Sequence, residues 1–406
     1  MKTKLLHTPY ELPDPYGSLS MSVYHTAAYE FATAEEMADA FQAKLPKHTY
    51  SRVTNPTVQY FEQRVQTITG ALSVTAMNSG MAAITNAIIA LTKAGGNIVT
   101  SPHLFSNTFS FFVNTLTDFG VETRFCDLTN PIDVNENIDS NTCCVFLEII
   151  TNPQLKIPDL HSLAEIVHRK NIPLVADTTI IPFHVFKAAE WGVDIEVVST
   201  TKYVSGGATS LGGLIIDYGN FDWNRSAKLG DLAKTFGNSA FTAKIRKEIH
   251  RNMGAYMTPH VAYMQTLGLE TLALRYEKAC DSCLILARQL SLLPEIVSVN
   301  YPGLVTNPFY KICQKQFGDK PGAVLTFDLT SREACFRFLN NLKLIRRATN
   351  LFDNKTLAIH PASTIFGTFT AEIREKMNIS ESTVRLSVGL EDVEDLLQDI
   401  KQALEF

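Results

Sequence analysis

The sequence predicts an α/β fold, with a large domain built on a mainly parallel, doubly wound sheet and a smaller C-terminal α/β domain. Between about residues 57 and 215, apolar runs of strand length alternate with segments of helical periodicity. After about Met253 the pattern changes to one long helical stretch, followed by further strand and helix candidates. At 406 residues the chain is long enough for roughly two or three domains that each bury a core.

The alternating region supplies the elements of the large domain. Its strand candidates are Ile98–Thr100, Glu122–Cys126, Val145–Ile149, Pro173–Ala176 and Ile195–Ser199. Its helix candidates are Thr57–Thr69, Met81–Thr92, Thr108–Phe119, Leu160–Arg169 and Val185–Glu190. Such alternation is typical of βαβ units, which place parallel strands next to one another.

The two ends of the chain complete this division. Beyond the helical stretch Leu267–Leu293, the strand and helix candidates are Ala323–Leu329, Val384–Val388, Arg332–Leu342 and Asp392–Leu404. Roughly the first 50 residues lack a strong period and are rich in Pro, Tyr and Thr, so we expect an extended arm that lies on a neighbouring subunit. We therefore expect the arm at 1–53, the large domain at 54–252 and the C-terminal domain at 253–406.

Composition and charge exclude several classes of protein. The chain carries 41 acidic and 36 basic residues without long blocks of one sign, so nothing predicts nucleic-acid binding. No segment reaches about 18 apolar residues and no apolar core of signal-peptide length begins the chain, so we expect a cytoplasmic protein without membrane contact. Neither a paired metal-ligand spacing nor a Walker, GxGxxG or GxSxG motif occurs. We expect no metal site and a small molecule as partner.

Three groups stand where the predicted sheet would bring them together. Asp177 ends an apolar run, Lys202 follows the next one, and Asn78 to Met81 (NSGM) opens a helix. In open α/β sheets, ligands bind at the carboxyl ends of the strands. An amine, a carboxylate and free helix-end amides are what pyridoxal 5'-phosphate requires, for a Schiff base, for the ring nitrogen and for the phosphate. Ser199 and Thr201 can add hydroxyls to that phosphate site.

Motifs spread over nearly the whole chain resemble the Cys/Met-metabolism family of pyridoxal-phosphate enzymes. They are YSRVTNPT (50–57), SGMAAI (79–84), EIITNP (148–153), DTT (177–179), STTKY (199–203) and RLSVGLE (385–391). Within that family, further segments resemble the O-acetylhomoserine sulfhydrylase branch: GATSLGG (207–213), IDYGNFDW (216–223), NPQLK (152–156), GLETLALR (268–275) and IHPAST (359–364). The resemblance implies the aspartate aminotransferase-like fold (fold type I), with 54–252 as the cofactor-binding domain.

The resemblance also implies a role for each site residue. Lys202 would carry the cofactor and Asp177 would pair with its ring nitrogen. The residues implied to hold the cofactor's phosphate and ring are Gly80, Met81, Phe105, Asn152, Thr179, Ser199 and Thr201. Tyr50 and Arg52 would reach the phosphate of the neighbouring subunit, which implies a dimer with shared active sites and, as the family usually assembles, a tetramer. Arg385, with Asn152 beside it, would grip the substrate's α-carboxylate.

The sequence departs from the branch at three positions. Phe105 stands where a ring-stacking Tyr is usual, and Gly207 where a His is common. Phe366 stands where a His often follows the Pro-Ala-Ser-Thr run. The implied reaction is γ-replacement on O-acetyl-L-homoserine with sulfide or methanethiol, which gives homocysteine or methionine. Two alternatives remain open: a γ-lyase acting on methionine, cystathionine or a related amino acid, and a non-catalytic subunit that keeps the fold.

Overall fold

The computed structural model, which describes residues 2–7 and 16–405, has a seven-stranded sheet in the order β1-β7-β6-β5-β4-β2-β3. Its strands are β1 (Ser73–Met77), β2 (Asn97–Thr100), β3 (Glu122–Phe125), β4 (Thr142–Glu148), β5 (Leu174–Asp177), β6 (Ile195–Val198) and β7 (Gly213–Asp217). The strands from β6 to β3 run parallel, whereas β7 is antiparallel to both of its neighbours. The mainly parallel sheet is confirmed, but the antiparallel β7 makes it a mixed one.

Helices cover both faces of this sheet because successive strand residues point to opposite cores. On β4, Cys144 and Phe146 pack into one core while Val145 and Leu147 pack into the other. The first face is the one with Cys144 and Phe146. The helices on this face, together with those in the segment after β7, are α4 (Gly80–Leu91), α5 (Ser106–Ser110), η1 (Phe111–Thr115), α6 (Leu116–Asp118), η4 (Trp223–Arg225), α9 (Gly230–Phe236), η5 (Gly237–Ser239), α10 (Ala240–Lys244), η6 (Ile245–Ile249) and α11 (His250–Met253). With the second face pack α1 (Lys2–Leu6), α3 (Pro56–Thr69), α7 (Pro131–Asn137), α8 (Leu160–Arg169), η2 (Ala188–Trp191) and η3 (Tyr203–Ser205).

A second, five-stranded sheet forms the C-terminal part, in the order β10-β11-β12-β9-β8. Its strands are β8 (Ser298–Asn300), β9 (Val324–Asp328), β10 (Arg346–Arg347), β11 (Leu357–Ile359) and β12 (Thr383–Ser387). Its helices are α13 (Tyr310–Phe317), α14 (Arg332–Asn341), η7 (Pro361–Ser363), α15 (Ala371–Lys376) and α16 (Val393–Leu404). The expected strands and helices of this part are confirmed to within a few residues, while the domain limits at 53 and 252 stay a prediction.

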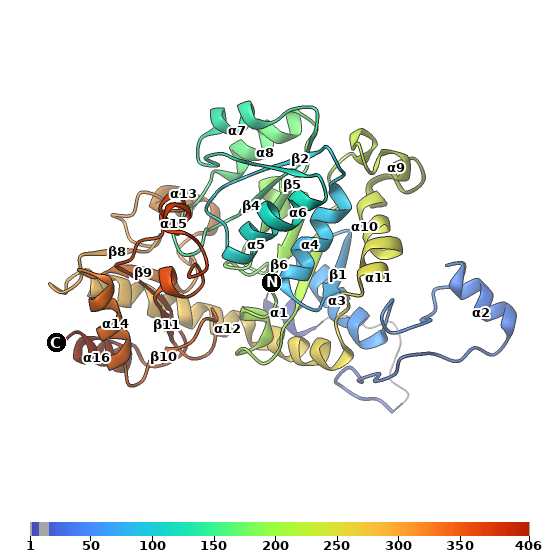
Figure 1. Ribbon diagram of the computed structural model, residues 1–406. Coiled ribbons are helices and arrows are strands. Elements are labelled where there is room, and N and C mark those ends of the chain that lie inside the picture. Colours follow the sequence, from blue (N-terminus) through green and yellow to red (C-terminus); the bar gives the residue numbers. More distant parts are fainter. Residues whose placement is uncertain (1, 8–15, 406) are drawn as a thin grey trace.

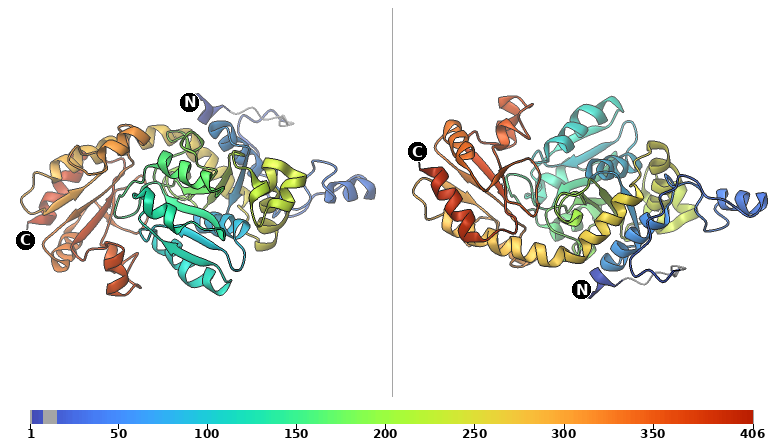
Figure 2. Two further views of the ribbon diagram at one scale, coloured as in Figure 1. Left: turned by 90° about the horizontal axis from the view of Figure 1, so that it is seen from above. Right: turned by 90° about the horizontal axis from the view of Figure 1, so that it is seen from below.

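One helix, α12 (Pro259–Leu290), runs along both parts of the molecule (Figures 1 and 2). It packs against α1 and α3 of the large part and against β8, β9 and α16 of the C-terminal part. The helix begins earlier than the expected Leu267, because Thr258 caps it by accepting a hydrogen bond from the Val261 amide and Pro259 fits its first turn.

Two other helices differ from expectation. The stretch Val185–Glu190 was expected to be helical but forms only the short 3₁₀ turn η2, since the amides of Val185 and Phe186 both bond back to the Pro182 carbonyl in a tight turn. The expected helix Thr108–Phe119 contains the π turn η1 in its middle. Within residues 2–7 and 16–405, no helix is both long and apolar enough to span a membrane.

The segment of the arm that carries α2 (Ala34–Phe41) extends away from the body of the molecule (Figure 1), whereas α1, which also falls in the expected arm, packs against α3 and α12. Thr33 caps this helix by accepting from the Glu36 amide. Met37 and Phe41 are 47% and 58% exposed, which is unusual for large apolar side chains on an amphipathic helix. Contact of the arm with a neighbouring subunit stays a prediction.

Candidate active site

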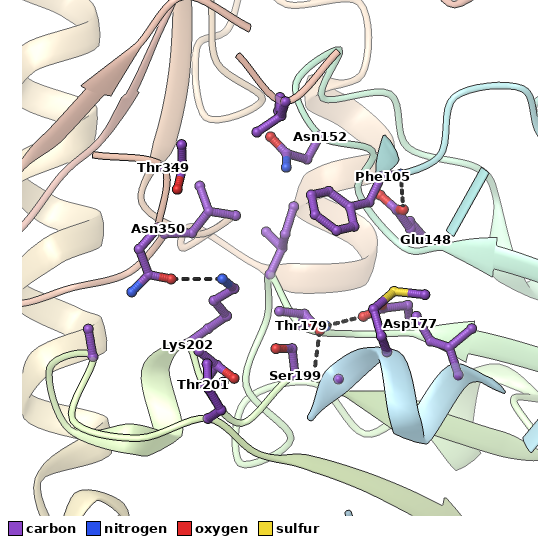
Figure 3. A pocket seen from close by; sticks show the side chains of 18 of the residues that line it. Phe105, Glu148, Asn152, Asp177, Thr179, Ser199, Thr201, Lys202, Thr349 and Asn350 are labelled. Carbon is purple, nitrogen blue, oxygen red and sulfur yellow. Dashed lines mark hydrogen bonds between the residues drawn. The ribbon is translucent and has the colours of Figure 1, made fainter. Parts of the chain in front are cut away.

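A cavity of about 560 Å³ lies at the carboxyl ends of β4, β5 and β6, closed on one side by residues of the C-terminal part (Figure 3). Its lining includes Gly80, Met81, Phe105, Glu148, Asn152, Asp177, Thr179, Ser199, Thr201, Lys202, Thr349, Asn350, Ile365 and Arg385. Parallel strands gather the residues that follow them at one edge, which is why positions far apart in the sequence meet here. All the predicted site residues except Tyr50 and Arg52 line this cavity.

Lys202 projects into the cavity from the turn that follows β6, and its Nζ donates a hydrogen bond to Oδ1 of Asn350 at 2.7 Å (Figure 3). Burial and the positive charge of Arg385 lower the pKa of this amine to about 8, although Asp177 opposes the shift. A lowered pKa leaves a larger share of the amine unprotonated near neutral pH, and only the unprotonated amine is a nucleophile. Lys202 is therefore suited to form a bond to a carbonyl carbon.

Asp177 ends β5 and is held by the chain that follows it. The Thr179 amide donates to Oδ1 of Asp177 at 2.9 Å, and Thr179 Oγ1 accepts from the Ser199 amide at 2.9 Å. Burial raises the pKa of Asp177, against the effect of the hydrogen bonds from Thr179 and of the charge of Lys202. A cationic ring nitrogen is the partner that would favour the charged form of such a carboxyl group.

The start of α4 forms a close-fitting cradle against the turn after β6. Ser79 caps the helix by accepting from the Ala82 amide at 3.1 Å, so the amides of Gly80 and Met81 lie in the first turn, where helical partners are lacking. A Cβ built on Gly80 would lie 2.5 Å from Cβ of Ser199, so only glycine permits this approach. Helix-end amides beside a hydroxyl are a site for a phosphate group.

Arg385 on β12 is 2% exposed and has no carboxylate partner within residues 2–7 and 16–405. Its NH1 donates to Oδ1 of Asn152 at 3.1 Å, and its NH2 donates to the carbonyls of Thr349 and Asn350 at 3.2 and 3.3 Å. Its Nε finds no acceptor in the part of the chain that the structure describes. Burial lowers the pKa of this guanidinium to about 9. A buried arginine with an unused donor fits a substrate carboxylate.

Glu148 lines the cavity but was not among the predicted site residues. Its Oε1 accepts a hydrogen bond from the Phe105 amide at 2.6 Å (Figure 3). Burial, and secondly the charge of Asp177, raise its pKa well above the ordinary value. An acidic residue inside the apolar run of β4, one strand from Asp177, was the signal that could have identified it.

Asn350 and Thr349 were also missed, and their sequence context offers no signal. They lie in an irregular segment between β10 and β11, which carries neither a period nor a motif. Only the folded chain brings this segment to Lys202.

Tyr50 and Arg52 lie outside the lining of this cavity, in the arm. NH1 of Arg52 donates to the Arg251 carbonyl at 2.6 Å, and its guanidinium lies 5.5 Å from the centre of the Tyr50 ring. This placement leaves both side chains near the surface, with Tyr50 43% exposed. Their reach into a neighbouring site stays a prediction.

The three departures have different structural contexts. Phe105, the first departure, lines the cavity, as expected of a side chain that stacks on a cofactor ring. Gly207 has φ of +127°, which strains any larger residue, and a Cβ there would lie 2.4 Å from Nδ2 of Asn354. Phe366 is fully buried and packs on Phe369, with ring centres 5.8 Å apart, while its neighbour Ile365 faces the cavity. Only Phe105 changes the polarity of the cavity directly.

These features together fit pyridoxal 5'-phosphate. The cavity offers a reactive amine, a carboxyl group, an aromatic ring and a phosphate cradle in which only glycine fits. Each of these features is needed to hold one part of that cofactor. In the described part of the chain, no group of three or more His, Cys, Asp and Glu side chains is placed to hold a metal ion.

Comparison with known proteins gives concordant findings. The family model described as "Cys/Met metabolism PLP-dependent enzyme" matches residues 2–405. O-acetyl-L-homoserine sulfhydrylase 1 of Thermus thermophilus is 39% identical over 99% of both chains, and an L-methionine gamma-lyase of Fusobacterium nucleatum is 36% identical over 97% of this chain and 95% of its own. A solved structure from Campylobacter jejuni, described as a "putative O-acetylhomoserine (thiol)-lyase", contains N'-pyridoxyl-lysine-5'-monophosphate. It is 32% identical over 100% of this chain and 99% of its own, with a TM-score of 0.93.

Proposed function

The chain belongs to the Cys/Met metabolism family of PLP-dependent enzymes, and from this premise we propose that it catalyses γ-replacement on O-acetyl-L-homoserine. Sulfide or methanethiol would be the second substrate, with homocysteine or methionine as product. The observation that carries the proposal is that one cavity brings together Lys202, Asp177 and Arg385, whose Nε has no acceptor in the described part of the chain. The likeness to a named sulfhydrylase over the whole chain supports the choice of substrate.

In this proposal the cavity residues divide between cofactor and substrate. Lys202 would hold pyridoxal 5'-phosphate covalently, Asp177 would pair with its ring nitrogen and Phe105 would hold its ring. The groups that hold the rest of the cofactor are the amides of Gly80 and Met81 and the side chains of Asn152, Thr179, Ser199 and Thr201. The hydroxyl of Thr201 is tied to Gly212, whose amide donates to it at 3.1 Å, which fixes its direction.

The bound cofactor supplies an electron-withdrawing ring that takes up negative charge from the amino acid. Arg385 binds the α-carboxylate bidentately and so orients the carbon atoms that react. Lys202 Nζ would remove the Cα proton, for which its lowered pKa suits it. A Cβ proton would leave next, acetate would depart from Cγ, and the sulfur nucleophile would add to Cγ and give up its own proton. Protons would then return to Cβ and Cα, which gives the saturated amino acid product.

Assembly and location are part of the same proposal. Tyr50 and Arg52 complete the phosphate site of a neighbouring subunit, so that active sites form only in a dimer, and dimers pair into tetramers. The exposed apolar side chains of the arm support a contact with a second copy of the chain. A cytoplasmic location, expected from the sequence, stays a prediction.

The second candidate is a γ-lyase, favoured by the likeness to an L-methionine gamma-lyase. In that reaction no sulfur nucleophile adds, and water finally releases ammonia and a 2-oxo acid. A substrate panel with the purified holoenzyme separates the two. We expect homocysteine from O-acetyl-L-homoserine and sulfide to exceed 2-oxo acid release from methionine or cystathionine. Equal or greater 2-oxo acid release would establish the lyase instead.

A further inference from the structure

Two segments from different parts of the molecule lie side by side at the cavity and make a series of paired contacts. Residues 202–206 follow β6, and residues 350–354 lie between β10 and β11. Lys202 Nζ donates to Asn350 Oδ1 at 2.7 Å, and the rings of Tyr203 and Phe352 stack with centres 3.9 Å apart and planes 16° apart. Asn354 Nδ2 then donates to the Gly206 carbonyl at 3.0 Å. Three successive contacts therefore join the large part to the C-terminal part at Lys202.

The backbone of Phe352 is strained in this arrangement. Its φ is +57°, in the left-handed region that glycine adopts freely and bulky side chains avoid. The residue is nonetheless 2% exposed, and its amide donates to Oγ of Ser387 at 2.7 Å. Strain of this kind persists only where surrounding contacts overcome it. The aromatic ring of Phe352 therefore contributes something that a glycine here would not.

The partner ring, Tyr203, is fixed on its other sides. Its hydroxyl accepts from the Ala323 amide at 3.0 Å, and its ring meets Tyr276 edge-on with centres 5.1 Å apart. Phe352 lies on its face. Since Tyr203 is the residue after Lys202, a fixed Tyr203 limits the directions in which the Lys202 side chain can extend.

We propose that Phe352 is a positioning residue for Lys202, holding Tyr203 by its ring and, through the same short segment, presenting Asn350 to the Lys202 amine. This inference rests on the proposed function in one respect, that Lys202 is the residue that bonds the cofactor. In that step the unprotonated amine attacks the aldehyde carbon of pyridoxal phosphate, a carbon–nitrogen double bond forms, and the aldehyde oxygen leaves as water. A misplaced amine slows this step without changing how tightly the phosphate is held.

The experiment follows the uptake of cofactor by the full-length apoprotein. The rate of bond formation with pyridoxal phosphate is read by absorbance, and borohydride reduction with peptide mapping confirms the label on Lys202. Pyridoxamine phosphate, which has no aldehyde, gives the affinity for the cofactor's other groups. The variants are Phe352→Gly, which permits the positive φ without the ring, and Phe352→Leu, which keeps apolar bulk. Phe338→Leu is the matched control, because Phe338 is a buried ring of the C-terminal part that meets Phe327 edge-on.

We expect both Phe352 variants to slow bond formation about tenfold or more, with the dissociation constant of pyridoxamine phosphate within about threefold of the parent. Phe338→Leu should leave both values near the parent's. Tyr203→Leu is also made, alone and together with Phe352→Leu. The double variant should be no slower than the slower of these two single variants, because the two rings act as one unit.

Two results would overturn the positioning role: rates of the Phe352 variants within twofold of the parent, or a loss of pyridoxamine phosphate affinity as large as the loss of rate. If Phe352→Gly does not fold, Phe352→Leu decides on the same criteria. A parent protein that carries no label on Lys202 refutes the proposed function itself, and the positioning role with it.

Discussion

Glu148 and Asp177 are register partners on the neighbouring parallel strands β4 and β5, so two carboxyl groups lie side by side at the floor of the cavity. Two neighbouring carboxyl groups in a poorly solvated site do not both ionise readily. Burial and the charge of Asp177 raise the pKa of Glu148 well above its ordinary value. Burial also raises the pKa of Asp177, but the hydrogen bonds from Thr179 and the charge of Lys202 oppose that rise. We therefore expect Glu148 to hold a proton more readily than Asp177.

This division predicts opposite outcomes for two amide substitutions. Glu148→Gln keeps a neutral group that still accepts the Phe105 amide, so kcat should stay within about threefold of the parent. Asp177→Asn removes the carboxylate that faces the ring nitrogen, so kcat should fall by about 100-fold or more. Steady-state rates with the preferred substrate pair measure both. An equal loss in the two variants would mean that Glu148 works as an anion.

The apoprotein should gain stability when Lys202 is replaced by a neutral side chain. The pKa of Lys202 is lowered to about 8 in the folded chain from an ordinary value of 10.5. Below pH 8 the amine is charged in both states and its burial costs the folded state. Between pH 8 and 10.5 the unfolded chain holds more protons, so the cost falls as pH rises. Lys202→Met should therefore melt a few degrees above the parent at pH 7, with a smaller difference at pH 10. The exposed Lys401→Met serves as control, and a gain that does not shrink as pH rises contradicts the prediction.

Substitution of Arg385 should separate substrate binding from cofactor binding. Arg385→Lys keeps the charge but loses the planar pair of donors, so kcat/KM for the amino acid should fall about 10- to 100-fold. Cofactor content, read from the absorption of the purified protein, should not change. Arg347→Lys is the matched control, since Arg347 bonds the Leu339 carbonyl and lies outside the cavity lining. A loss of cofactor content would instead place Arg385 in the cofactor site.

Shared active sites can be tested by mixing two inactive proteins. Lys202→Ala lacks the amine and Arg52→Ala lacks the predicted phosphate contact to the neighbour. A hybrid dimer carries one site with neither lesion, so activity should return towards about a quarter of the parent's when subunits exchange freely. Native mass spectrometry confirms the exchange. Hybrids that form but stay inactive would show that each chain completes its own site.

The missing phenol at Phe105 predicts a preference among leaving groups. Acetate leaves Cγ as a stable anion, whereas the thiolate of methionine gains from a nearby acid, which typically contributes roughly 10²- to 10⁴-fold. Phe105→Tyr should therefore raise cleavage of methionine more than replacement on O-acetyl-L-homoserine, as measured by kcat/KM for each. Phe109→Tyr controls for a phenol outside the cavity lining. Equal changes in both reactions would remove Phe105 from the choice of leaving group.

Strands with strong apolar runs could be predicted from the sequence. Strands that form mainly because adjacent strands pair with them could not. Runs such as Ile195–Val198 are buried on both faces and so read as strands in the sequence. β1 and β7 were missed, since β1 holds Ser73 and Thr75 among its apolar residues and β7 begins in the glycine-rich segment after Lys202. Their pairing in the sheet, rather than their composition, makes them strands.

The same distinction holds for the site. Lys202, Asp177 and Arg385 follow or end strands and belong to motifs, so the sequence marks them. Asn350 and Phe352 belong to an irregular segment, and their importance arises only when the C-terminal part meets Lys202. Phe366 shows the converse, because a motif position suggested a lost polar group where the structure has a buried core side chain.

The continuous helix α12 means that the chain cannot be divided cleanly between its two sheets. A fragment that ends before Pro259 would expose the surfaces of α1 and α3 that this helix covers, and one that starts there would carry buried residues such as Leu269 and Tyr276 into water. Each half would lose packing that α12 provides between the two parts of the molecule. Gene truncation, split reporters and domain exchange with relatives should therefore keep α1, α3 and α12 together with both sheets.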